Sequence, residues 1–337
     1  MSSLLEAWDR LSVDGESGDG YVRLRLLDVS ACSAFAAKRS EGSLEAIVLD
    51  VHTSALPPSA EYPDTRGAKL SVYGLTPGPG GTTRIVLSLA DGSYLDVFRR
   101  LGEDLVDRLR RAASEGEAVR GFISGLARWQ AFLRRHGSAG LTLEARRGLF
   151  GELFLLLKRV LPRTGAPAAI ASWKGCTGAS HDFQWRDGSI EVKTTSASTP
   201  HAFHVSSVQQ LDMAGQGQLF IYFAVVDEAE AGDFSLPDLI EAFRQEFTQP
   251  ALDAFEDCLV EAGYLEGMRQ VYASPRYSVR RERFFRVDEG FPRLRESRLP
   301  QGVEAVRYEV AVSACSAWEV EATEALDAVL GPEEVAR

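Results

Sequence analysis

The sequence has little lysine, no clustered cysteine and no long apolar run, and each shortage narrows the classes of protein to consider. Only five of its 37 basic residues are lysines. Cys32, Cys176, Cys258 and Cys315 are scattered, without a C-x-x-C or a Cys/His cluster. A structural zinc site is therefore not expected, and the thiols fit a reduced, cytoplasmic protein. The longest apolar runs, such as residues 219–226, are far shorter than the roughly 20 residues that span a bilayer. No basic segment followed by an apolar one opens the chain, so neither secretion nor membrane contact is expected.

Three catalytic signatures are absent as well. The chain contains no G-x-S-x-G nucleophile turn, no Walker phosphate loop and no G-x-G-x-x-G dinucleotide motif. These absences argue against serine hydrolases, P-loop ATPases and Rossmann enzymes. Any ATP-driven step must come from a partner protein.

The length of 337 residues, at roughly 100 to 200 residues per domain, indicates two domains or one catalytic core with large additions. Alternating apolar residues and a Pro/Gly turn at residues 77–81 predict a β-rich N-terminal domain over residues 1–100. An arginine-rich helical connector is expected over residues 101–140. An α/β core is expected over residues 141–230, and a C-terminal α+β extension over residues 231–337.

The core is expected to begin with a helix over residues 141–161, which Pro162 ends. Apolar runs and alternation predict the elements that follow. Strands are expected at residues 168–173, 181–185, 189–195 and 219–226, and a helix at residues 206–214. The predicted fold class is α/β.

Acidic and basic residues are segregated along the chain. The net charge of −11 argues by itself against a nucleic-acid partner, because phosphate binding relies on cationic contacts. However, residues 164–268 hold sixteen acidic residues against four basic ones, whereas residues 269–298 hold nine arginines against four acidic residues. Residues 99–163 are basic too. This pattern fits a carboxylate-rich site between phosphate-holding segments, and a solvated arginine face is the alternative.

The triplet Glu191-Val192-Lys193 is the only acidic-x-lysine sequence in the chain. By itself it is a weak signal, because about 0.7 such matches are expected by chance. The turn signal Asp187-Gly188 strengthens it, since a two-residue hairpin loop there would pair Asp182 with Lys193 and Gln184 with Glu191. These four polar side chains would then share one face of the hairpin. The apolar set on the opposite face would be Phe183, Trp185, Ile190 and Val192.

Two readings of this polar face stay open. Carboxylates and an ammonium across adjacent strands form a cross-strand ion pair on a solvated sheet, worth about 0.2–1 kcal/mol. They are also what a magnesium site needs, because Mg²⁺ commonly takes one or two carboxylates together with waters and a phosphate. A lysine beside them can orient or deprotonate the attacking water and offset charge that grows on the phosphate.

Two further residues favour the functional reading. Glu152 has Leu149 and Leu156 as its i−3 and i+4 neighbours on the expected helix, so it borders the apolar stripe and needs a partner there. The alternative is a surface glutamate in a good helix-forming position. Gln210 lies on the helix expected after the hairpin and could contact a phosphate or a metal-bound water, or be an ordinary helix-surface amide.

The order of these residues resembles the restriction-endonuclease-like PD-(D/E)XK fold. A helix with Glu152 is followed by a first strand, a strand with Asp182 and a strand with Glu191 and Lys193, and then by a further helix and strand. His181 stands where the superfamily has its proline. The segments with the narrower resemblance, to a bacterial family assigned to this superfamily, are residues 148–153, 181–183, 191–194 and 206–211.

This resemblance implies a restriction-endonuclease-like αβββαβ core and metal-dependent hydrolysis of DNA phosphodiester bonds, in a bacterial restriction or phage-defence system. Asp182, Glu191, Glu152 and the Val192 carbonyl would hold Mg²⁺ or Mn²⁺, while Lys193 would position the attacking water. The partners it implies are DNA, an ATPase, methyltransferase or other defence-system protein, and a second copy in a homodimer.

The basic stretch 269–298 is predicted to hold the nucleic-acid backbone through Arg280, Arg281 and Arg283. The alternative function is a catalytically inactive nucleic-acid-binding or scaffold subunit that keeps the fold. Binding of a duplex in Mg²⁺ without cleavage would favour that alternative.

Overall fold

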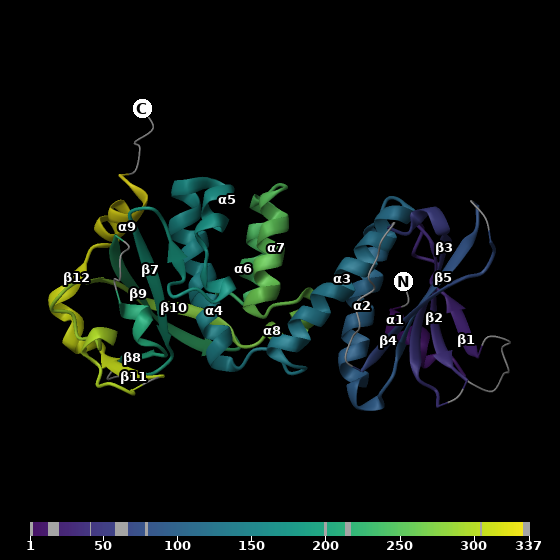
Figure 1. The fold of residues 1–337 in the computed structure, drawn as a ribbon, viewed down its shortest axis with the longest axis horizontal. Coiled ribbons are helices and arrows are strands. Elements are labelled where there is room, and N and C mark those ends of the chain that lie inside the picture. The colour runs from purple at the N-terminus through teal and green to yellow at the C-terminus, as the bar shows by residue number, and fades with distance from the viewer. Residues whose placement is uncertain are drawn as a thin grey trace. The chain divides into compact units, whose positions relative to one another are not determined.

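The computed structural model describes residues 3–12, 20–40, 42–57, 67–77, 80–198, 201–212, 217–303 and 305–332. It is a mixed α/β structure that forms two compact units, whose elements are labelled in Figure 1. The N-terminal unit comprises Met1–Gly140 with Leu265–Met268, and the C-terminal unit comprises Leu141–Tyr264 with Arg269–Arg337. The four-segment division predicted from the sequence is finer and stays a prediction. Among the helices in the described ranges, none is long and apolar enough to cross a membrane.

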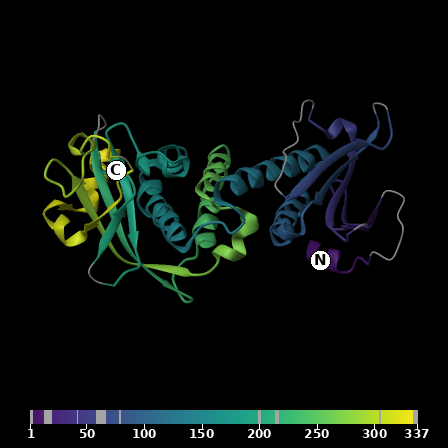
Figure 2. The same cartoon turned by 60° about the horizontal axis from the view of Figure 1, so that its bottom comes forward.

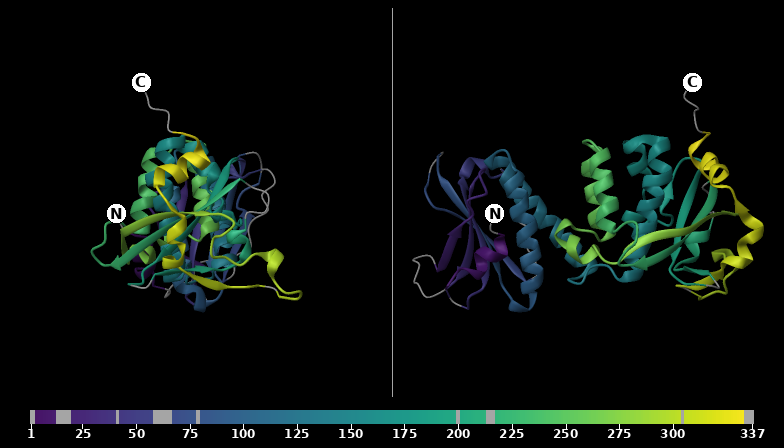
Figure 3. Two further views of the ribbon diagram at one scale, coloured as in Figure 1. Left: turned by 90° about the vertical axis from the view of Figure 1, so that its left-hand side faces the viewer. Right: turned by 180° about the vertical axis from the view of Figure 1, so that it is seen from behind.

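An antiparallel sheet of five strands, in the order β1-β2-β3-β5-β4, forms the N-terminal unit. This sheet confirms the strands predicted from alternation, while residues 78 and 79 of the predicted turn lie outside the described residues. Figure 3 shows α2 and α3 along one face of the sheet. The elements are α1 Leu4–Asp9, β1 Tyr21–Arg25, β2 Ser33–Arg39, β3 Glu45–His52, η1 Thr53–Ala55, β4 Ala68–Gly74, β5 Thr82–Leu89, η2 Gly92–Tyr94, α2 Leu95–Arg111, α3 Glu115–His136 and η6 Glu266–Met268.

A second sheet of five strands, in the order β12-β10-β9-β7-β6, forms the centre of the C-terminal unit. Strands β7 and β9 are parallel, and a separate two-stranded sheet pairs β11 with β8. The helical elements are α4 Leu143–Leu155, the π-helical turn η3 Leu156–Val160, α5 Leu161–Ser172, η4 Gly175–Thr177, η5 Val208–Leu211, α6 Leu236–Glu246, α7 Ala251–Ala262, α8 Arg269–Tyr272, η7 Glu296–Arg298, η8 Val312–Trp318 and α9 Ala322–Leu330. The strands are β6 Phe183–Gln184, β7 Gly188–Thr195, β8 Ala202–Val205, β9 Gln218–Ala229, β10 Arg276–Val287, β11 Tyr308–Ala311 and β12 Glu319–Val320.

Strand β9 lies in the middle of this sheet and is buried on both faces. Its residues from Leu219 to Val226 are all at most 1% exposed, as expected for a strand covered by other elements on both sides. Figures 1 and 2 show α4 on one side of the sheet and the C-terminal segment with α9 on the other. The apolar run predicted as a buried strand is therefore confirmed.

Three element predictions for this unit are wrong. Pro162 does not end the helix: the helical backbone continues from η3 through Pro162 in the first turn of α5 and is interrupted only at Gly165 (φ 72°, ψ 166°). Residues 168–173 do not form a strand, since α5 continues to Ser172 and only Trp173 makes an isolated bridge, to Phe183. In place of the helix predicted at 206–214, the described residues form the short 3-10 turn η5, and residues 213–216 lie outside the described ranges.

Candidate active site

Strands β6 and β7 form the predicted hairpin, but in a different register. Phe183 pairs with Ile190 and Gln184 with Ser189, and the Trp185 N–H donates to the Gly188 carbonyl at 2.8 Å. The predicted pairing of Asp182 with Lys193 is therefore wrong by two residues. Gly188 belongs to the strand rather than to the turn, since it is the first residue of β7 and pairs with Gln218 of β9. A Cβ there would lie only 2.4 Å from the Gln218 carbonyl oxygen, so this close approach requires glycine.

A shift of two residues leaves the assignment of faces unchanged, because side chains alternate with a period of two. Asp182 therefore stays on the same side of the hairpin as Glu191 and Lys193. The carboxylate of Asp182 also contacts the next strand directly: its Oδ2 accepts a hydrogen bond from the Val192 N–H at 2.7 Å. The main chain of the triplet thus fixes the position of this carboxylate.

Glu191 and Lys193 form a buried ion pair. The Lys193 Nζ lies 2.8 Å from Glu191 Oε1, and the two residues are 1% and 8% exposed. The reading as a cross-strand ion pair on a solvated sheet face is therefore wrong. Moving two charges out of water is costly unless further hydrogen bonds satisfy them, yet the buried Glu191 Oε2 has no hydrogen-bond partner among the described residues.

Gln210 holds the lysine from the opposite side. Its Oε1 accepts a hydrogen bond from Lys193 Nζ at 2.8 Å and another from the Ser206 N–H at 3.0 Å. Gln210 belongs to η5 rather than to a full helix. Its contact with Lys193 distinguishes it from an ordinary surface amide.

Glu152 reaches the same region from α4. Gly151, just before it, allows α4 to approach β7 closely, because a Cβ there would lie 2.3 Å from the Thr194 Cγ2. The Glu152 Oε2 accepts a hydrogen bond from the indole Nε1–H of Trp173 at 2.7 Å. Glu152 is partly exposed, so it remains within reach of solvent and ligands.

Gly175 brings Glu152 and Asp182 together. The N–H groups of Lys174 and Gly175 donate to the Asp182 carbonyl at 2.7 and 2.9 Å, which holds this segment against the start of the hairpin. A Cβ on Gly175 would lie 2.6 Å from Glu152 Oε2 and 2.8 Å from Asp182 Oδ1. Two carboxylate oxygens therefore border one small space that only a glycine leaves free.

The residues Glu152, Asp182, Glu191 and Lys193 are called the acidic cluster below. Burial is the main cause that raises the pKa of each of its carboxyls, to about 6 for Asp182 and about 8 for Glu191. The pKa of Glu152 is also raised, by burial and then by the charge of Asp182. Lys193 acts in the opposite direction on all three but does not outweigh burial. The cluster therefore has more negative charge than one ammonium neutralises, and it favours either protons or an added cation.

The donor chemistry of the cluster fits a hard, oxygen-preferring cation such as Mg²⁺ or Mn²⁺. Within the described ranges, no group of three or more His, Cys, Asp or Glu side chains converges as a complete ligand set. Carboxylate oxygens that could still bind a cation are nevertheless present. Glu152 and Asp182 both face the space at Gly175, and Glu191 Oε2 has no hydrogen-bond partner in the part of the chain that the structure describes. The oxygen ligands are thus of the type that such a cation prefers. However, only two of them, from Glu152 and Asp182, face one common space.

The three arginines predicted to hold nucleic acid lie on β10. Arg280 forms an ion pair with Asp227 at 3.0 Å, and Arg283 forms a two-pronged ion pair with Glu319 in which Nε lies 2.8 Å from Oε1. Arg281 is exposed. Acidic groups of the protein itself therefore neutralise part of the basic charge of this stretch.

Trp173, Gly151 and Gly175 are parts of the site that sequence reasoning missed. Trp173 holds Glu152, and the two glycines permit the close approaches that gather the carboxylates. The glycine directly before Glu152 on the expected helix, Gly151, could have indicated from the sequence that this helix packs closely against a neighbouring element. The sequence around Trp173 and Gly175 carries no comparable signal.

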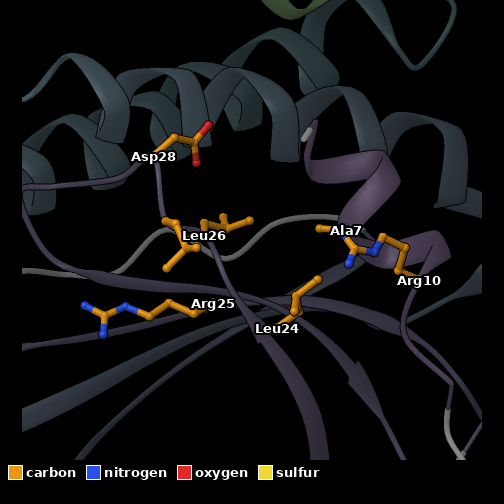
Figure 4. A pocket seen from close by; sticks show the side chains of 7 residues that line it. Ala7, Arg10, Leu24, Arg25, Leu26 and Asp28 are labelled. Atoms are coloured by element: carbon orange, nitrogen blue, oxygen red, sulfur yellow. The ribbon is translucent and has the colours of Figure 1, made fainter. Parts of the chain in front are cut away.

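A pocket of about 400 Å³ lies apart from this chemistry, in the N-terminal unit (Figure 4). It is lined mainly by Ala7, Leu24, Leu26 and Leu27. Its acidic residue, Asp28, is paired with Arg110 at 2.8 Å. Arg10 and Arg25 also line it, so the pocket combines apolar with basic side chains and has no group of carboxylates like the acidic cluster.

Comparison with known families covers nearly the whole chain. The family described as "Putative PD-(D/E)XK family member, (DUF4420)" matches residues 4–313, a range that contains the whole acidic cluster. No curated protein and no solved structure gave a match. Because the family matches far more than half of its length, this chain belongs to that PD-(D/E)XK family.

Proposed function

We propose that the protein is a metal-dependent nuclease that hydrolyses phosphodiester bonds of DNA. The observation that carries this proposal is the buried Glu191–Lys193 pair beside Asp182 and Glu152. Such a cluster is costly to fold and is therefore typical of a site kept for chemistry. Family membership supports the same reaction class.

Mg²⁺ is the proposed cofactor, with Mn²⁺ as a substitute. The residues that would hold it are Asp182, Glu191 and Glu152 together with the Val192 carbonyl. When bound, such a cation polarises the phosphate and makes a bound water more acidic. The protein's own contribution would be to hold Glu152 and Asp182 beside one small space, with Glu191 nearby, where a cation offsets the repulsion between these carboxylates.

Lys193 is the proposed group that acts on the water. Its Nζ is held between Glu191 Oε1 and Gln210 Oε1, each at 2.8 Å, so its position is defined before substrate binds. The ammonium would orient the attacking water and offset negative charge that grows on the phosphate. Gln210 would keep the ammonium in place.

The restriction-endonuclease-like αβββαβ core is proposed to be α4, the isolated bridge at Trp173, β6, β7, η5 and β9. The bridge takes the place of the first strand, and the 3-10 turn η5 takes the place of the second helix. The proposed partners are DNA, held in part by exposed arginines such as Arg281, and other proteins of a restriction or phage-defence system, such as an ATPase or a methyltransferase. A second copy of the chain is also a proposed partner, because restriction-type cleavage of both strands uses two sites.

The test is cleavage of supercoiled and linear duplex DNA by the full chain, in Mg²⁺, in Mn²⁺ and with a chelator. We expect cleavage that needs the cation and is lost in Asp182→Asn. Asp187→Asn is the matched control, because Asp187 is an exposed carboxylate in the β6–β7 turn. Duplex that is bound but never cut in either cation would contradict the nuclease proposal and favour an inactive binding subunit.

A further inference from the structure

Two cysteine side chains contact each other next to the acidic cluster. The Sγ of Cys176, in η4, lies 2.7 Å from the Sγ of Cys258, in α7. Cys176 directly follows Gly175, the residue that borders Glu152 and Asp182. The thiol pair is therefore one residue away from the site.

A second contact holds the two sulfurs in position. The rings of Trp173 and Phe255 pack with centroids 6.2 Å apart, and each of these residues precedes its cysteine by three positions. Both aromatic residues are buried, at 1% and 0% exposure. Because aromatic residue and cysteine are three positions apart on both segments, packing of the two rings also holds the two sulfurs next to each other.

The two thiols differ in their access to solvent and in their acidity. Cys176 is 1% exposed, whereas Cys258 is partly exposed. The hydrogen bond from Cys176, and to a smaller extent the charge of Lys174, lower the pKa of Cys258, although burial and the charges of Asp257 and Glu261 act in the opposite direction. Cys258 is therefore the thiol that a small reagent would meet first, in its more reactive form.

We propose that Cys176 and Cys258 are a reversible oxidation site at which hydrogen peroxide forms an intramolecular disulfide. In the first step the Cys258 thiolate attacks a peroxide oxygen, the O–O bond breaks, and a sulfenic acid and hydroxide form. In the second step that hydroxide takes the proton of the Cys176 thiol and becomes the first water. The Cys176 thiolate then attacks the Cys258 sulfur, the S–S bond forms and the S–O bond breaks, and the departing hydroxide takes up the proton that Cys258 had released to solvent, which gives the second water. The two sulfurs together give two electrons to one peroxide, and two waters are released.

The disulfide would stabilise the segment that organises the acidic cluster. Trp173 donates to Glu152, and Gly175 donates to the Asp182 carbonyl, so a covalent bond from Cys176 to α7 restrains both contacts. The bond closes a loop between residues 82 positions apart, which predicts a melting temperature higher by several degrees, up to about 10 °C. This inference goes beyond the proposed nuclease function and does not depend on it.

The test uses the full, reduced chain treated with increasing hydrogen peroxide, then with N-ethylmaleimide, and digested without reductant for mass spectrometry. We expect a cross-linked peptide that joins Cys176 to Cys258 and is lighter than the two reduced peptides together by two hydrogens. Dithiothreitol should reverse both the cross-link and the rise in melting temperature. Because this measurement needs no variant, it decides the proposal even if substitutions at these sites fail to fold.

Variants provide the controls. Cys32→Ser and Cys315→Ser should keep the cross-link and the shift in melting temperature, whereas Cys258→Ser should lose both. Cys258 oxidised to a sulfinic acid without any cross-link would overturn the proposal. A disulfide that joins two chains through Cys258, or a pair that stays reduced while Cys32 reacts, would overturn it as well.

Discussion

Replacing Gly175 with alanine tests whether Glu152 and Asp182 act as one cation-binding pair. The added methyl would lie 2.6 Å from Glu152 Oε2 and 2.8 Å from Asp182 Oδ1. Both oxygens must therefore move away from it, by about 0.8 and 0.6 Å, to reach an ordinary contact of about 3.4 Å. Gly175 is not among the glycines with positive φ, so the substitution causes crowding without backbone strain. We expect crowding of this kind to cost about 1–3 kcal/mol of folding free energy.

The larger effect should fall on cation binding. Metal sites tolerate deviations of only about 0.2 Å in ligand distance, so we expect Mn²⁺ affinity, measured by calorimetry, to fall at least about tenfold, or roughly 1.4 kcal/mol. Gly148→Ala is the matched control, because Gly148 lies on the same helix as Glu152. A Cβ at this position would meet nothing within 4 Å among the described residues. That variant should keep its Mn²⁺ affinity and gain about 0.5–1 kcal/mol of stability from helix propensity. A Gly175→Ala chain with native circular dichroism and unchanged Mn²⁺ affinity would refute the pairing of Glu152 with Asp182.

Three further predictions concern the same unit. Because the pKa of Glu191 is raised from 4.5 to about 8, the folded chain binds this proton more tightly than the unfolded chain. The free energy of unfolding should therefore fall as pH rises across that window, and Glu191→Gln should flatten the slope measured by urea titration. Lys193→Ala should abolish cleavage. Above pH 8 it should also lower the free energy of unfolding by about 3 kcal/mol, since Glu191 then loses its buried partner. The same substitution at the exposed Lys69 should have neither effect. Reversal of Arg280 and Arg281 to glutamate should weaken DNA binding for all sequences alike and flatten its salt dependence. If the same reversal at Arg134 and Arg135 has the larger effect, the phosphate-holding role belongs to residues 99–163.

The acidic cluster destabilises the folded chain as long as no further positive charge is added to it. This follows from the raised pKa values of its carboxyls and from Glu191 Oε2, which has no hydrogen-bond partner among the described residues. Burial disfavours each carboxylate, and Lys193 supplies a single compensating charge. A bound cation would stabilise the folded chain by mass action and would release protons from these carboxyls. Proton release on addition of Mg²⁺, absent in Asp182→Asn, is thus a readout that does not need cleavage.

The sequence by itself was sufficient to identify the side chains of the acidic cluster. Alternation of apolar residues determined which residues share a face, and a two-residue error in register could not change that assignment, because side chains alternate with a period of two. Glu152 could be singled out because a carboxylate beside an apolar stripe needs a partner. The buried strand β9 followed from its continuous apolar run.

Only the tertiary structure decided the register, the burial and the gathering of these residues. Gly188 looks like a turn residue in the sequence, yet its pairing with Gln218 makes it the first residue of β7, and that neighbour is thirty residues away. The contacts of Trp173 with Glu152, of Gly175 with both carboxylates and of Cys176 with Cys258 all join segments from different elements. Local patterns specify which way a side chain points, whereas contacts between distant segments depend on how helices and strands pack, which no local pattern encodes.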